Sequence, residues 1–79
     1  MVVNIVYHIP VNDASAYEFM GIDGNGVVVF SGHESLDGVL YGMYGREMKK
    51  SAPKSGLMEE SVRIFAEEFG LIVNKVIYF

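Results

Sequence analysis

Residues 1–9 read MVVNIVYHI and residues 72–79 read IVNKVIYF. Both segments are rich in strand-forming residues, and apolar side chains occupy both of their alternating faces. A sheet with one face in water shows apolar and polar residues in alternation, whereas near-continuous apolar runs are typical of strands covered on both sides. The pattern therefore predicts strands at the two chain ends that need a covering layer on each face.

A hairpin is predicted between the apolar segments 16–22 and 27–30. The first follows a polar break at residues 10–15, and Asp23-Gly24-Asn25-Gly26 separates the two. Its Asp-Gly and Asn-Gly steps are strong short-range hairpin signals. A phosphate-binding loop is the alternative for this glycine-containing turn, but no helical pattern follows it.

Residues 34–51 carry the signals of a helix. Ser31 and Glu34 match the S-x-x-E capping pattern, and Pro53 stands where the helix would end. Three glycines would line one stripe of this helix, beside Tyr41. They would either let the helix approach a neighbouring element closely or form a flat groove for a partner's backbone. These glycines are Gly38, Gly42 and Gly45.

Residues 57–69 form the clearer helical pattern. Apolar residues recur at helical spacing on one side, and Gly70 follows at the expected stop. On the other side, Arg63 lies four residues from Glu59 and from Glu67, a spacing that permits ion pairs along the helix. The residues expected to face the core are Met58, Val62, Phe65 and Phe69.

Together these segments predict an α+β protein with a single domain, residues 1–79, and the element order β-β-β-α-α-β. The sheet would be single, four-stranded and mostly antiparallel, with two helices packed on one face. The first and last strands would be neighbours because both are long and otherwise unpaired. A chain of 79 residues buries only a marginal share of its surface, so association would stabilise it.

The second face of this sheet would have no helix to cover it. A second copy of the chain or another protein would then bury its apolar side chains, and we expect a homodimer. Burial would contribute roughly 25 cal/mol per Å² of apolar area. The residues expected on this dimer face are Val2, Val6, Met20 and Ile22.

The chain is acidic, with a net charge of −4, and it has no cysteine. The negative balance disfavours direct binding of nucleic acid, and a larger protein with a basic surface is the more natural partner. The absence of cysteine excludes disulfides and thiolate metal sites. No apolar run approaches the roughly 18 residues of a membrane span. We therefore expect a soluble, cytoplasmic protein without a membrane partner.

Exposed acidic and aromatic side chains that local structure does not need are the candidates for partner binding. Acidic residues in the last turn of a helix oppose its dipole, and tyrosines are common interface anchors. The expected partner-binding residues are Asp37, Tyr41, Glu59, Glu60, Glu67 and Glu68.

Catalytic and metal-binding motifs are missing from the sequence. The two histidines, His8 and His33, would have to meet near a carboxylate such as Glu34 to hold a metal ion. No zinc-protease motif and no nucleophile elbow occurs. Paired carboxylates of the glycosidase kind stay open, because ten acidic residues allow many pairs. We expect neither enzymatic activity nor a cofactor.

Residues 30–40, which read FSGHESLDGVL and follow the predicted hairpin, resemble the strand-to-helix passage of HicB-type antitoxins. That resemblance implies a truncated ribonuclease-H-like fold with the order β-β-β-α-β. The Pro-Asp-Leu-Pro-Gly segment typical of the family is replaced here by residues 22–26, and an additional helix precedes the last strand.

The sequence favours a non-enzymatic protein–protein interaction module. The expectation is a small acidic inhibitor of a larger protein, with nucleic-acid-handling proteins as a natural target. Phage-encoded inhibitors of host defence, such as anti-CRISPR proteins, act in this way, and the comparison is one of class. The alternatives are a HicB-like antitoxin and a small dimeric ligand-binding protein or enzyme with its site between the subunits.

Overall fold

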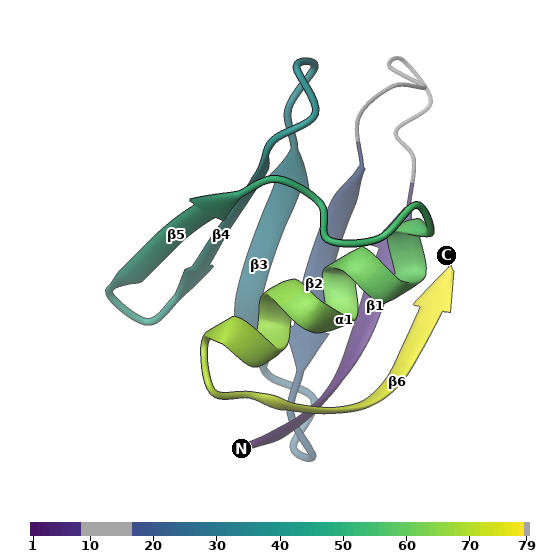
Figure 1. Cartoon of the computed structure of the whole chain (residues 1–79). Coiled ribbons are helices and arrows are strands. Elements are labelled where there is room, and N and C mark those ends of the chain that lie inside the picture. The colour runs from purple at the N-terminus through teal and green to yellow at the C-terminus, as the bar shows by residue number, and fades with distance from the viewer. Residues whose placement is uncertain (9–16, 79) are drawn as a thin grey trace.

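The computed structural model describes residues 1–8 and 17–78, which form one mixed sheet with a single helix packed on it (Figure 1). The predicted four-stranded sheet with two helices is therefore wrong. The predicted break at 10–15, and Ile9, Ala16 and Phe79 at the ends of predicted strands, lie outside the described residues. The elements are β1 (Val2–His8), β2 (Glu18–Ile22), β3 (Val28–Glu34), β4 (Leu40–Tyr44), β5 (Glu47–Ser51), α1 (Met58–Glu68) and β6 (Ile72–Tyr78).

The six strands lie in the order β5-β4-β3-β2-β1-β6. The first four neighbouring pairs in this order are antiparallel, whereas β1 and β6 are parallel. The first and last strands are neighbours, as predicted. Figure 1 shows α1 crossing one face of the sheet as the chain passes from β5 at one edge to β6 at the other. This is the kind of connection that parallel strands need.

Residues 34–51 are not a helix but the end of β3, a turn and the β4–β5 hairpin. Gly38 and Gly45 have positive φ angles of 85° and 61°, and each lies in the turn that precedes or follows β4. Glycine adopts this backbone conformation without the strain that a side chain causes. Gly42 lies inside β4, so the three glycines belong to two turns and a strand.

The capping pattern of Ser31 and Glu34 lies within β3 and caps no helix. The strand-to-helix passage expected from the likeness to HicB-type antitoxins is also wrong, because residues 30–40 run from β3 through a turn to the first residue of β4. The helix that follows Pro53 in the chain is α1.

The hairpin predicted at Asp23-Gly24-Asn25-Gly26 is confirmed. Strands β2 and β3 pair antiparallel, and the Gly26 amide donates to the Asp23 carbonyl at 3.0 Å. The Asp23 carboxylate accepts hydrogen bonds from the backbone amides of Asn25 and Val27, at 2.8 and 3.0 Å. The aspartate therefore holds the turn through its side chain as well as its backbone.

Helix α1 confirms the prediction for residues 57–69 to within one residue at each end. Gly70, with a φ angle of 82°, follows as the expected stop. Ser61 is buried, and its hydroxyl donates to the Ser55 carbonyl at 2.8 Å and accepts from the Ser55 amide at 3.2 Å. This pair of bonds ties the loop before α1 to its first turn.

The core lies between α1 and the sheet and is built largely from phenylalanine rings. Neighbouring ring centroids lie 5.1 to 6.2 Å apart. Gly32 and Gly42 are cross-strand partners beneath these rings, and the absence of side chains there makes room for them. The rings are those of Phe19, Phe30, Phe65 and Phe69.

Candidate functional site

The outer face of α1 carries four exposed carboxylates, and we call these residues the acidic helix face. The helix offers one cation, Arg63, but its Nη1 donates to the Val73 carbonyl at 3.0 Å. Arg63 is thereby held against β6, and the two ion pairs found among the described residues involve none of the helix acids. The ion pairs of Arg63 with Glu59 and Glu67 that the spacing permits are not made. The acidic helix face consists of Glu59, Glu60, Glu67 and Glu68.

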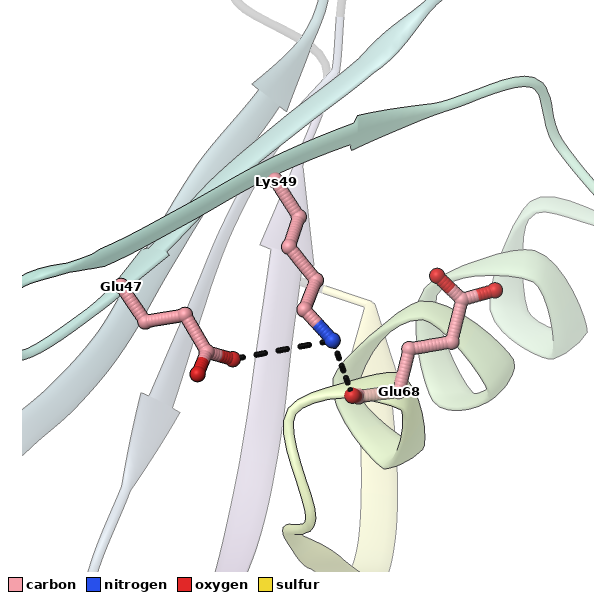
Figure 2. A network of polar contacts seen from close by, with 3 residues as sticks. All are labelled: Glu47, Lys49 and Glu68. Carbon is pink, nitrogen blue, oxygen red and sulfur yellow. Dashed lines mark hydrogen bonds and ion pairs between the residues drawn. The ribbon is translucent and has the colours of Figure 1, made fainter.

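A cation from β5 compensates the C-terminal end of α1. Lys49 Nζ donates to the Glu68 carbonyl at 2.6 Å and lies 3.6 Å from the Glu47 carboxylate (Figure 2). The same ammonium lies 5.2 Å from the centroid of the Phe69 ring. Positive charge is favourable at a helix C-terminus. Because Lys49 contacts the backbone oxygen of Glu68, the Glu68 carboxylate stays free to point away from it, as Figure 2 shows.

The opposite side of the sheet has no covering element among the described residues, and we call it the open sheet face. One polar row crosses it. His8 Nε2 lies 3.2 Å from Glu18 Oε2. The His33 ring is stacked on Tyr41, with centroids 5.4 Å apart and 12° between the planes. Successive register partners in this row are His8, Glu18, His33, Tyr41 and Lys50.

An apolar row runs beside the polar row on the open sheet face. Its successive register partners are Met48, Met43, Ser31, Met20, Val6 and Ile77. All four residues of the predicted dimer face lie on this face, two of them in this row and two, Val2 and Ile22, farther along their strands. Met43 and Met48 were not predicted to lie on this face. A strand period in residues 40–51 would have placed them here, but the same residues also fit a helical period.

Hollows on the open sheet face adjoin His33. One, of about 230 Å³, extends over Ser31, Tyr41 and Met43. Another, of about 320 Å³, extends over Glu18, Met20 and Ser31. Both form where the short side chain of Ser31 stands between long ones on the neighbouring strands. Their walls combine a few polar groups with methionine and tyrosine side chains.

The meeting of both histidines with Glu34, which a metal site would require, is not found. Glu34 follows His33 in a strand, so its side chain points to the other face, where burial raises its pKa. Glu18 instead stands between the two histidines in the register. Residues 1–8 and 17–78 contain no group of three or more histidine, cysteine, aspartate or glutamate side chains that could hold a metal ion.

The six predicted partner-binding residues do not form one surface. Tyr41 lies on the open sheet face, across the sheet from the acidic helix face. Asp37 lies in the turn before β4, where the Ser35 hydroxyl donates to its carboxylate. Asp37 therefore has a local hydrogen-bond partner in this turn. The four glutamates share α1: Glu60 and Glu67, seven residues apart, lie on its outer side, and Glu59 and Glu68, nine residues apart, flank that side in opposite directions.

Ser35→Ala is expected to raise the pKa of Asp37 toward its ordinary value, because the Ser35 hydrogen bond is the main cause that holds this pKa low. A carboxyl with a lowered folded-state pKa stabilises the fold above its unfolded pKa, and this contribution is lost as the pH falls through the folded pKa. Acidification below about pH 4 should therefore cost the wild type slightly more stability than the variant. NMR titration of the carboxyl checks the shift.

Ser31→Ala, on the open sheet face, is the matched control and should leave the pKa of Asp37 unchanged. An Asp37 titration that is the same in Ser35→Ala and in wild type would show that the hydroxyl does not set this pKa.

Comparisons with protein-family models, curated proteins and solved structures give no match for this chain. Among the described residues, the one helix is too short and too polar to cross a membrane. The arguments for function therefore rest on the two surfaces, the acidic helix face and the open sheet face.

Proposed function

We propose that this chain is a non-enzymatic protein-binding module that inhibits a larger protein by covering a basic surface on it. The supporting observation is the acidic helix face: four exposed carboxylates on one eleven-residue helix, with its only arginine turned to the Val73 carbonyl. Such a surface attracts a basic partner and repels nucleic acid.

The charge layout of α1 supports recognition more than stability. Glu59 and Glu60 lie in the first turn, where the helix dipole favours negative charge. Glu67 and Glu68 lie near the last turn, where negative charge is disfavoured and where Lys49 supplies the compensation. Exposed carboxylates that the fold does not require are available to a partner. Charges on the exposed side of a helix act chiefly on the rate at which a partner associates.

Proteins that handle nucleic acids carry the basic surfaces that this face fits. An acidic domain that covers such a surface competes with phosphate for the same cations. Phage-encoded inhibitors of host defence, including anti-CRISPR proteins, form a class that acts in this way, and an inhibitor of that class would act in the cytoplasm. The likeness is one of mechanism and class.

Reversing Glu60 and Glu67 to lysine together is expected to lower the association rate constant with the partner by roughly 10-fold or more, because steering by charge is lost. Thermal stability should change little, because the helix dipole disfavours lysine at Glu60 in the first turn and favours it at Glu67 near the last turn, by about 0.3–1 kcal/mol each. The partner would be captured with tagged chain from an extract of the native host, identified by mass spectrometry, purified, and titrated at increasing salt.

Glu18→Lys is the matched control, because Glu18 is an exposed acid on the open sheet face, across the sheet from the acidic helix face. It should leave association with the partner nearly unchanged. Binding that resists the double reversal, or that does not weaken as the screening length falls below about 8 Å, would contradict the proposal. Loss of activity in His8→Ala or His33→Ala with binding intact would favour a ligand site instead.

A further inference from the structure

The open sheet face is apolar along a line that crosses all six strands. Five of the six residues in its apolar row are hydrophobic, and the exposed fractions of Met43, Met48 and Ile77 are 45%, 72% and 45%. Val28 and Ile72 extend the apolar surface along their strands, at 50% and 61% exposed. Contiguous apolar surface of this extent is unusual on a monomer and marks an interaction site.

We infer that the occupant of this face is a second copy of the chain, stacked sheet on sheet about a two-fold axis. Strands lie about 4.8 Å apart and rise about 3.3 Å per residue, so six strands of five to seven residues present a face of roughly 25–30 by 17–23 Å. The flat area of such a face is roughly 400–700 Å². The accessible surface is larger, because side chains project from the sheet, and it approaches the roughly 800 Å² that each partner contributes to a standard interface. A stable dimer therefore has the area it needs.

The apolar row of one copy is complementary to that of a second copy when a two-fold axis runs parallel to the strands, midway between β2 and β3. This axis places β2 over β3, β1 over β4 and β6 over β5 of the other copy, so that every strand is covered. Met20 of one copy then lies over Ser31 of the other, where the hollows beside His33 leave room for a long side chain. The outer pairs would be Val6 with Met43 and Ile77 with Met48.

Charge also favours two copies meeting on this face. The chain carries a net charge of −4, which opposes self-association in general. On the open sheet face, however, Glu18 is accompanied by Lys50 and two histidines in the same row. The same axis places Glu18 over His33 of the other copy. The acidic helix faces lie on the two outer sides of such a dimer, as far apart as the molecule permits.

The dimer would present two acidic helix faces in opposite directions. If the proposed function holds, this arrangement makes the inhibitor bivalent toward an oligomeric target, with a gain in avidity. The dimer itself does not depend on the proposed function.

Light scattering after gel filtration tests the inference. The wild type at micromolar concentration should have twice the mass of the chain, and Met20→Glu and Met43→Glu should each be monomeric. A carboxylate buried without a partner should raise the dimer dissociation constant by about 100-fold or more. Leu36→Glu is the matched control, because Leu36 is a large hydrophobic residue that is 75% exposed outside the sheet. This control should remain dimeric.

Crosslinking tests the axis without relying on the stability of the glutamate variants. The wild type has no cysteine. A mixture of Val6→Cys and Met43→Cys chains should give a crosslinked dimer with a short bis-maleimide, whereas mixing either with Glu60→Cys should not. A monomeric wild type, or a dimer that survives both glutamate substitutions, would overturn the inference. The double reversal of Glu60 and Glu67 should leave the dimer intact, which separates this test from that of the proposed function.

Discussion

Phe65→Ala is expected to lower the free energy of unfolding by about 3–5 kcal/mol. Phe65 is 1% exposed, and its ring centroid lies 6.1 Å from that of Phe19 and 6.2 Å from that of Phe30. The ring also fills the space above Gly42, where a Cβ atom would stand 2.5 Å from it. Gly42 has no side chain that could move into the vacated volume, so a cavity would remain between α1 and β4.

Urea denaturation followed by circular dichroism measures this loss. A domain of this size is stabilised by about 5–15 kcal/mol in total, so the variant would approach or cross the limit of folding at 37 °C. Glu60→Ala, on the exposed side of the same helix, is the control and should stay within about 0.5 kcal/mol of wild type. A loss below about 1 kcal/mol in Phe65→Ala would show that the helix does not pack on the sheet as described.

Gly32→Ala is expected to destabilise the fold by about 1–3 kcal/mol or more, although it adds one methyl group. A Cβ atom at this position would overlap the backbone carbonyl oxygen of Tyr41 and stand 2.5 Å from the Phe19 ring. The phenylalanine ring could turn aside, but the carbonyl belongs to the neighbouring strand β4. The β3–β4 pairing would therefore have to shift to accept the methyl group.

Gly24→Ala is the matched control, because a Cβ atom at Gly24 meets nothing within 4 Å and its φ angle is not in the positive range. This variant should be nearly as stable as wild type in the same denaturation experiment. Equal stability of Gly32→Ala and Gly24→Ala would mean that β3 and β4 do not approach each other as closely as the structure places them.

Three parts of the fold follow from local sequence. The hairpin at Asp23 to Gly26 needs only its turn residues, and α1 needs only its apolar spacing and the stop at Gly70. The strands at the two chain ends are long and strongly strand-forming, and their pairing as neighbours was also predictable. In each case, short-range preferences and the final structure agree.

Residues 34–51 were mispredicted because two periods coexist there. Leu36, Val39 and Leu40 suit a helix, whereas Leu40 and Tyr44 alternate as they would in a strand. The roles of the three glycines, which favour the strand arrangement over the helix, become evident only in the folded protein. Gly38 and Gly45 form turns, and Gly42 is the place in the sheet where the Phe65 ring packs. No property of the segment alone reveals that a phenylalanine more than twenty residues later requires this space.

Two kinds of surface follow from the amino-acid pattern alone. Glu60 and Glu67, seven residues apart, lie on the outer side of a helix that packs by its apolar side, and two-sided apolar strands require a covering layer. The size of the open sheet face depends on the folded structure, because β4 and β5 bring Met43 and Met48 to it. The folded structure also places Tyr41 on the side opposite the acids. Register between strands far apart in the chain sets these positions, and no local preference encodes that register.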